Sequence, residues 1–339
     1  MKIWRKFSTA AERTGPRARL GLLAALTVLA ALLSLCLGPV SLSLRELLQV
    51  LAGSGSETAA SILLYVRLPR TLGCLLAGCA LAVSGAVIQG VLANPLAAPG
   101  TIGVNAGAGF LVAVCCAVAP GAVTAVPLAA FLGAFGSALL VLGIGERTGA
   151  SRLTLVLAGV AVSQIFSAGI DALLTFFPDA LSGYSDFRIG GLTNLTTARL
   201  LPAAVVILVC LALLLALAGD LDILLLGSDT AQSLGLPVRR FRILFLALAA
   251  ALAGAAVSFA GLLNFVGLLV PHIMRRLAGE ESRVLLPACA LGGAALVTLC
   301  DLAARTLFSP YELPVGILLS LAGGPFFLWL LLRQRRRRT

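Results

Sequence analysis

The sequence predicts an all-α membrane protein with about ten transmembrane helices, and its composition and its hydropathy pattern are the observations behind that prediction. Of the 339 residues, 60% are hydrophobic and only 12% are charged, and the mean hydropathy is +1.06. Soluble domains carry about 25% charged residues, so a soluble enzyme, a disordered chain and a fibrous protein are excluded. The apolar runs are continuous rather than alternating, which favours spanning helices over membrane strands.

Ten apolar runs account for the predicted helices, each near the ~20 residues that a bilayer-crossing helix needs. The first follows a basic head, is longer than the core of a signal peptide and lacks a small-residue cleavage site, so we interpret it as an uncleaved span. An amphipathic and then polar connection, 41–58, follows it. The eighth run is short and rich in glycine and proline, and the others are uninterrupted. The predicted spans are 20–38, 69–90, 100–119, 125–145, 153–175, 200–218, 242–259, 262–274, 284–300 and 313–332.

Ten spans place both chain ends on one side of the membrane, and the basic residues predict that this side is the cytoplasm. Of the 25 Lys and Arg residues, 19 fall in the chain ends and breaks on that side, and six fall on the other. The net charge of +11 therefore indicates orientation rather than a nucleic-acid partner. We divide the chain into a basic cytoplasmic N-terminus (1–19), a single transmembrane domain (20–332) and a basic cytoplasmic tail (333–339).

The topology also permits two five-helix halves. Because five is an odd number of spans, two related halves would have to be inverted with respect to each other. No residue-level repeat is visible, so inverted pseudo-symmetry is a hypothesis that rests on the number of spans alone.

Two common kinds of active site are excluded by residues that the sequence lacks. Its only lysines, Lys2 and Lys6, precede the first span, whereas a P-loop that binds ATP needs a lysine in GxxxxGK[ST]. The single histidine, His272, disfavours a zinc site built from several imidazoles. The eight cysteines lie in or beside apolar runs and are interpreted as small helix-packing residues. We therefore predict no catalytic residue, no metal site and no cofactor bound by this chain.

Asn94, Pro95 and Pro99, within NPLAAP after the second span, predict a tight turn on the cytoplasmic side. Two prolines so close together prevent a helix from continuing. The glycines that follow, between Gly100 and Gly109, allow close packing of the next helix. A rigid turn before a packing helix is the simpler interpretation, and a role in substrate handling is the alternative.

A second segment on the cytoplasmic side, 228–237, predicts a short helix that ends at a proline. Ser228 or Asp229 can cap its start and Gly235 can end it. We expect Ala231 and Leu234 to be exposed on it, which would form a docking knob for a partner. An interfacial connector that lies on the lipid headgroups is the alternative.

Three arginines on the opposite, outward side, Arg67, Arg70 and Arg305, stand where positive charge is disfavoured. Snorkelling to the interface, an acidic partner, and a helix pair between Asp301 and Arg305 four residues apart are the three explanations. Asp171 lies within the fifth span and is a functional candidate because ionisable groups at that depth are costly.

Taken in order, the motifs of the chain resemble those of permeases of iron-siderophore and cobalamin ABC importers, the FecCD-type family. The resemblance runs from Arg67 to Leu332. It rests on RLPR at 67–70, NPLAAP at 94–99, GVNAGA at 103–108, LVLAG at 155–159, AQSLGL at 231–236, NFVGLLVPHIMR at 264–275, DLAAR at 301–305 and ELPVG at 312–316.

The resemblance implies a permease subunit of an ATP-driven importer in a bacterial inner membrane, which transports a ferric siderophore or a related metal chelate. It implies ten spans, a pathway formed with a second permease subunit (identical or paralogous), two separate cytoplasmic ATPases that bind the ATP, and an extracytoplasmic binding protein. Arg67, Arg70 and Arg305 match positions that face acidic residues of the binding protein. Residues Ala231, Gln232, Ser233, Leu234 and Gly235 match a coupling helix that contacts the ATPase.

Two departures from the family pattern and two rival classes remain. Ala98 stands where an acidic residue is usual, and the tryptophans common after the fifth span are absent from 187–192. A secondary transporter driven by an ion gradient would need paired acids near the membrane midplane, and Asp171 alone gives little support for it. A membrane-embedded enzyme is disfavoured by the lone His272.

Overall fold

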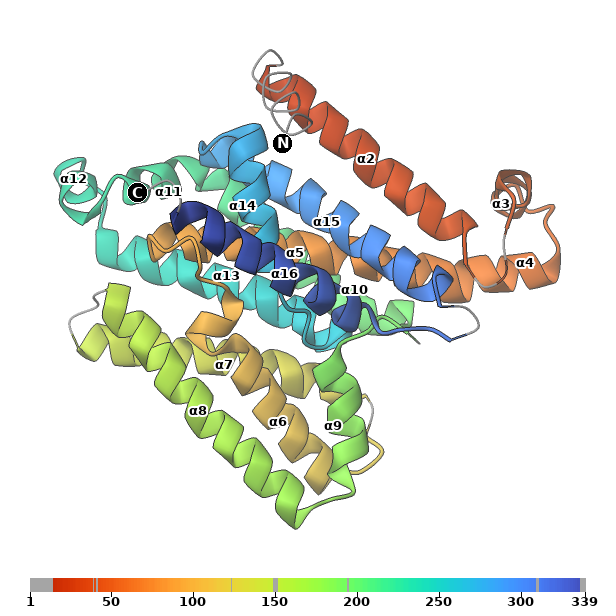
Figure 1. Cartoon of the computed structure of the whole chain (residues 1–339), viewed down its shortest axis with the longest axis horizontal. Helices are drawn as coiled ribbons and strands as arrows, with labels where there is room; N and C mark the ends of the chain where they lie inside the picture. Colours follow the sequence, from red (N-terminus) through yellow and green to blue (C-terminus); the bar gives the residue numbers. More distant parts are fainter. Residues whose placement is uncertain are drawn as a thin grey trace.

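The computed structural model, shown in Figure 1, describes residues 15–335 except 39, 41, 123, 149–151, 194, 309 and 310. The described residues are helical with no strand, and a helix stands at each of the ten predicted spans. Most of the predicted basic N-terminus (1–14) and most of the predicted basic tail (336–339) lie outside the described residues. The ten helices are α2 Pro16–Cys36, α5 Leu68–Val91, α6 Val104–Val118, α7 Val126–Arg147, α8 Arg152–Phe176, α10 Thr197–Ala216, α13 Val238–Ala260, α14 Val266–Ala278, α15 Ser282–Thr306 and α16 Val315–Arg335.

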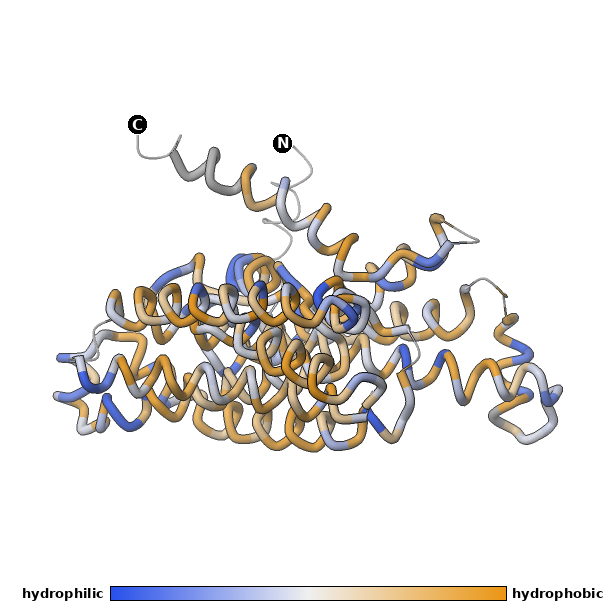
Figure 2. The backbone as a smooth tube through the Cα atoms, turned by 90° about the horizontal axis from the view of Figure 1, so that it is seen from below, coloured by the Kyte–Doolittle hydropathy of each residue, from blue (hydrophilic) through white to orange (hydrophobic). Residues whose placement is uncertain are grey.

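Seven of these helices are long and apolar enough to cross a membrane, and two shorter ones, at Val104–Val118 and Val315–Leu328, are also apolar. The remaining one, α14, has only 13 residues, as the glycine and proline content of the eighth run predicted. Figure 2 shows hydrophobic residues along the helices and hydrophilic residues gathered near their ends. The chain is therefore a multi-pass membrane protein.

Helix α5 lies at the centre of the bundle and packs against α13, α14 and α15. Glycines make this close packing possible. In lipid the hydrophobic effect does not drive helices together, so they associate through van der Waals contacts that require their backbones to approach closely. A Cβ added to Gly78 would lie 2.1 Å from the carbonyl oxygen of Gly293 on α15. One added to Gly85 would lie 1.9 Å from that of Gly267 on α14.

The 41–58 connection contains more structure than the sequence predicts. Helices α3 (Leu44–Leu51) and α4 (Glu57–Ser61) form there, and α4 continues through a π-helical stretch η1 (Ile62–Arg67) into α5. Helix α3 begins with a capping box in which Ser43 and Glu46 bond each other's backbone N–H.

The helix that runs without a break from Glu57 to Val91 has 35 residues. Its length of about 52 Å exceeds the ~30 Å hydrocarbon thickness of a bilayer. Accordingly, α3 and α4 project beyond the rest of the molecule in Figure 1. We call this end, where α2, α8 and α15 finish and which the charge bias predicts to face outward, the outer end.

Three short helices outside the ten spans complete the fold. Helix α9 (Ala180–Ile189) lies at the outer end, whereas α11 (Ala218–Leu225) and α12 (Ser228–Ser233) lie at the opposite, inner end. Helices α2 and α8 occupy opposite edges of the molecule in Figure 1. All eight cysteines are free.

Candidate functional site

The functional residues predicted from the sequence fall into an inner group and an outer group, as their predicted sides require. The inner group contains the 94–99 turn and helix α12. The outer group contains Arg67, Arg70 and Arg305. The structure adds a third group in the middle of the bundle, where two interrupted helices meet.

The segment that contains Asn94, Pro95 and Pro99 forms two successive turns between α5 and α6. The side-chain oxygen of Asn94 accepts a hydrogen bond from the backbone N–H of Leu96 at 2.9 Å, and the Asn94 carbonyl accepts one from Ala97 at 3.0 Å. Pro99 then starts a short 3₁₀ helix, η2 (Pro99–Ile102). The hydrogen bond between the Asn94 side chain and the backbone two residues further, together with the fixed φ of Pro99, makes this connection rigid.

Helix α12 has the end that the sequence predicts but not the start. Its C-terminus is a Schellman motif, in which Leu236 N–H donates to the Ala231 carbonyl, Gly235 N–H donates to the Gln232 carbonyl, and Gly235 has φ +83°. The N-cap is Gly227, so the prediction that Ser228 or Asp229 caps the helix is wrong. The Ser228 hydroxyl instead accepts a bond from Arg242 of α13, at 3.1 Å.

The exposed surface of α12 also differs from the prediction at one residue. Leu234 is 61% exposed, as expected, whereas Ala231 is completely buried. Ala231 turns inward because it lies on the side of the helix that packs against the bundle. Leu234 is therefore the apolar side chain that α12 presents at the inner end, together with the turn at Gly235.

At the outer end, Asp301 of α15 lies between two arginines. The Arg70 guanidinium donates to both carboxylate oxygens, with its Nη2 at 3.0 Å from Oδ1, and its Nη1 bonds Glu312 at 2.8 Å. The Nε atom of Arg305 lies 3.5 Å from the other Asp301 oxygen, four residues away on the same helix. The predicted Asp301–Arg305 pair is confirmed, and Arg70 and Glu312 extend it to a network of four charges.

Arg67 and Arg305 also bind the C-terminal end of α2. Arg67 donates to the carbonyls of Leu35 at 2.6 Å and Cys36 at 2.7 Å, and also to that of Val40. Arg305 donates to the Ser34 carbonyl at 2.6 Å. The last carbonyls of a helix lack partners within the helix and carry partial negative charge, so the two guanidiniums fix the end of α2 to α5 and α15.

These contacts bury the three arginines. Their exposed fractions are 3% for Arg67, 7% for Arg70 and 3% for Arg305. Snorkelling into solvent is therefore not the explanation for their position. Their predicted contact with an acidic partner stays a prediction, and it would require the guanidiniums to exchange some of their present bonds.

In the middle of the bundle, two short helices begin beside each other and run to opposite ends of the molecule. They are α6 and α14, the third span of each half (Figure 1). Each follows an irregular segment whose last residue has positive φ, Gly103 at +83° and Phe265 at +66°. The Asn105 side chain bonds that of Asn264 at 3.3 Å across the junction. The arrangement agrees with inverted halves, in which interrupted helices mark the substrate route.

The pairing of Asn105 with Asn264 could not be predicted from the sequence. Both occur in the motifs GVNAGA and NFVGLLVPHIMR, but 159 residues separate them. A neighbouring contact ties α14 to α5, where Arg275 bonds the side chain of Gln89 at 2.6 Å. Among the residues that the structure describes, the buried Nε2 atom of His272 has no hydrogen-bond partner.

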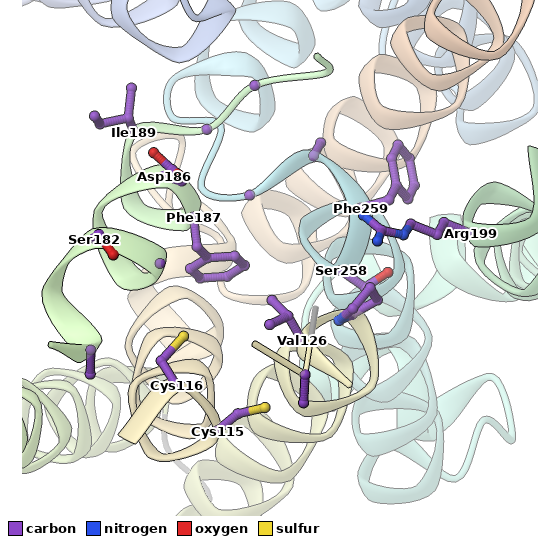
Figure 3. Close-up of a pocket in the computed structure, with 18 of the residues that line it drawn as sticks. Cys115, Cys116, Val126, Ser182, Asp186, Phe187, Ile189, Arg199, Ser258 and Phe259 are labelled. Atoms are coloured by element: carbon purple, nitrogen blue, oxygen red, sulfur yellow. The ribbon is translucent and has the colours of Figure 1, made fainter. Parts of the chain in front are cut away.

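A cavity of about 640 Å³ opens at the outer end between α6, α7, α9 and α13. In Figure 3, Asp186 and Ser182 of α9 lie on one side of it, and Arg199 of α10 reaches towards Ser258 of α13 on the other. The thiols of Cys115 and Cys116 lie on its floor. No sequence motif marked this cavity, because its lining residues fall in four separate stretches of the chain, within 115–127, 179–199 and 258–261 and at Pro314.

Comparison with known proteins places these features in a family. Residues 26–333 match the FecCD transport family. The chain is 40% identical over 334 residues to the hemin transport system permease protein HmuU of Yersinia pestis, covering 96% of this chain and 99% of that protein. It is 33% identical to the Fe(3+)-citrate import system permease protein YfmE of Bacillus subtilis, covering 97% and 99%.

The fold agrees with these relatives. A solved structure described as an inward-facing conformation of a metal-chelate type ABC transporter superposes with a TM-score of 0.85 at 31% identity, covering 94% of this chain and all of that one. The protein belongs to the FecCD transport family.

Proposed function

We propose that this chain is the membrane-spanning permease subunit of an ABC importer for a metal chelate of the ferric siderophore, haem or ferric citrate class. The observation that carries the proposal is the full-length likeness to permeases of hemin and iron-chelate importers. The bundle agrees with it, because the Asn105–Asn264 junction is polar but uncharged. Such a surface suits a bulky chelate that passes through rather than one that is held tightly.

The energy for transport would come from two separate ATPase subunits at the inner end. The chain contains no P-loop lysine, and Leu234 on α12 presents the apolar contact that an ATPase groove requires. ATP binding would close the ATPase pair, and α12 would transmit that motion through Arg242 and Ser228 to α13. Alternating access would follow at the interface with a second permease subunit, identical or paralogous. The chain would sit in the bacterial inner membrane with both termini in the cytoplasm.

An extracytoplasmic binding protein would dock at the outer end, through Arg67, Arg70 and Arg305. Arg67 is the best placed of the three, because its partners are neutral carbonyls. Arg67 would form a stronger hydrogen bond by exchanging a carbonyl partner for a carboxylate of the binding protein. Arg70 and Arg305 would gain less, because each already pairs with the carboxylate of Asp301. We expect Arg67→Ala to weaken binding of the binding protein to the reconstituted transporter about tenfold or more. Unchanged affinity, measured by surface plasmon resonance, would remove Arg67 from the docking site.

The proposal is tested by co-expression with the ATPase and the binding protein of a FecCD-type importer. We expect the affinity-tagged permease to purify with the ATPase, and the purified complex to hydrolyse ATP faster when the loaded binding protein is added. A permease that purifies alone and transports with a proton or sodium gradient would support the ion-coupled alternative instead.

A further inference from the structure

Helix α11 contacts the inner ends of two helices whose outer ends carry residues of the predicted docking site. It lies immediately before α12 in the chain, and it packs against α5 and α15 as well as against α12 and α13 (Figure 1). At the outer end, α5 carries Arg70, and α15 carries Asp301 and Arg305. Helix α11 therefore lies between the predicted ATPase contact and the two helices that hold the outer charge network.

The contact of α11 with α15 is a hydrogen bond to the backbone at the start of α15. The first N–H groups of a helix have no partner within it and carry partial positive charge. In the part of the chain that the structure describes, the N-cap residue of α15, Glu281, forms no side-chain cap bond. The Asp222 carboxylate of α11 accepts the Ser282 N–H instead, at 3.0 Å from one oxygen and 3.3 Å from the other. A carboxylate of α11 therefore caps α15 from outside that helix.

The contact of α11 with α5 comes from the same face of α11. Leu225 follows Asp222 by three residues and so lies one turn further on the same side of the helix. Its side chain packs against Gly90 near the inner end of α5, so closely that a Cβ added to Gly90 would lie 2.9 Å from the Cδ2 atom of Leu225. One face of α11 thus holds the inner ends of both helices.

Helices α5 and α15 are also joined to each other at two further levels. In the middle, a Cβ added to Gly78 or to Gly293 would lie 2.1 Å from the carbonyl oxygen of the other residue. At the outer end, the Arg70 guanidinium binds the Asp301 carboxylate at 3.0 Å. Since α15 has 25 residues, the pair extends over about 37 Å. Helices packed this closely resist sliding past each other, so we expect the α5–α15 pair to move as one body.

We propose that α11 couples the ATPase to the binding-protein site through the α5–α15 pair, and that Asp222 is the positioning residue for this coupling. The inference rests on the proposed function and adds a second route to it. The Ser228–Arg242 bond leads from α12 into α13, whereas the Asp222–Ser282 bond leads from α11 into the helix that ends at the outer charge network. Coupling between two sites is reciprocal. The same contact therefore lets a docked binding protein accelerate the ATPase and lets bound ATP change the affinity for the binding protein.

The first test measures how much the loaded binding protein stimulates ATP hydrolysis by the complete transporter in proteoliposomes. Asp222→Ala removes the cap of α15, and we expect the ratio of stimulated to unstimulated hydrolysis to fall on the order of fivefold. Asp222→Asn keeps an oxygen that can accept the Ser282 N–H, and asparagine caps helices about as well as aspartate does, so most of the stimulation should remain. Asp220→Ala is the matched control, because Asp220 lies on the same helix but about 200° away from Asp222.

The second test separates coupling from a purely structural role. It compares the affinity for the binding protein with and without ATP, by surface plasmon resonance, in a transporter whose ATPase binds ATP but does not hydrolyse it. We expect ATP to change this affinity in the wild type and to change it much less in Asp222→Ala, while the ATPase still purifies with the permease. A structural defect alone would lower both affinities and leave their ratio unchanged. If Asp222→Ala does not assemble, Leu225→Ala, which removes the contact with Gly90 of α5, should show the same loss of coupling.

Three results would overturn the inference. Wild-type stimulation together with a wild-type ratio of affinities in Asp222→Ala would remove α11 from the route. A loss in Asp222→Asn as severe as in Asp222→Ala would contradict the capping role, and an equal loss in Asp220→Ala would show that the effect is not specific to the cap. A wild-type complex that hydrolyses no ATP contradicts the proposed function instead, so the two failures are distinguishable.

Discussion

Asp301 lies at the centre of a charge cluster that connects α5, α15, the segment before α16 and the end of α2. Its carboxylate is 1% exposed and binds the guanidiniums of Arg70 and Arg305, and Arg70 in turn binds Glu312. Arg305 and Arg67 then fix the end of α2. With three arginines and two carboxylates, the cluster keeps one positive charge that its carboxylates do not balance, and the carbonyls of α2 stabilise it.

At the residue scale, we expect Asp301→Asn to be among the most destabilising single substitutions. It leaves the buried Arg305 without a carboxylate and Arg70 with Glu312 alone, and the loss of a buried ion pair costs about 3–5 kcal/mol. Thermal unfolding in detergent measures the change. Glu312→Gln is the matched control, because its side chain is 33% exposed and the loss should be much smaller. Equal effects of both substitutions would contradict the central position of Asp301.

Sequence reasoning could find only part of this cluster. The spacing of Asp301 and Arg305 on one helix was enough to predict their pair. The bond between Arg70 and Asp301 joins residues 231 positions apart, and the docking of α2 carbonyls on Arg67 depends on tertiary packing. Neither leaves a local pattern, so the burial of all three arginines could not be read from the sequence.

At the element scale, hydropathy and turn chemistry were sufficient to locate all ten spans, because a bilayer imposes both length and polarity on each helix. The short helices were harder. Helix α12 was predicted from Gly235 and Pro237, whereas α9 was missed because its sequence mixes polar and apolar residues without a clear period.

The close contact of α5 with α15 gives a prediction at this scale. We expect Gly78→Ala to lower the unfolding temperature in detergent by several degrees, since its new methyl group would lie 2.1 Å from the Gly293 carbonyl oxygen and separate the helices. Gly136→Ala on α7 is the control, because no atom lies within 4 Å of that position. An unchanged unfolding temperature for Gly78→Ala would show that the two helices do not meet so closely.

Helix α12 gives a second prediction. Leu234→Asp should reduce co-purification of the ATPase at least tenfold, because a carboxylate would have to be desolvated in an apolar groove. Leu48→Asp on α3 is matched to it in exposure, 59% against 61%, but lies at the outer end and should leave the ATPase bound. Equal retention of the ATPase by both variants would argue against coupling through α12.

At the scale of the whole molecule, the bundle is organised around the starts of α6 and α14, which lie beside each other. From there α6 runs towards the outer end and α14 runs towards the inner end. Gly85 and Gly267 bring α5 against α14 at this level, and the Asn105–Asn264 bond joins the two starts. The family motifs indicated this region from the sequence, yet only the fold shows that motifs from the two halves meet. The outer cavity depends on the same assembly of distant segments.

The central claim is that this permease moves a metal chelate by using ATP hydrolysed by partner subunits. The most direct test is uptake of a radioactive iron chelate into proteoliposomes that contain the permease and ATPase, with the loaded binding protein outside and ATP inside. We predict accumulation that requires ATP in the lumen, persists when ion gradients are collapsed by ionophores, and stops when the ATPase carries a P-loop lysine substitution. Uptake that continues without ATP and is abolished by the ionophores would contradict the account.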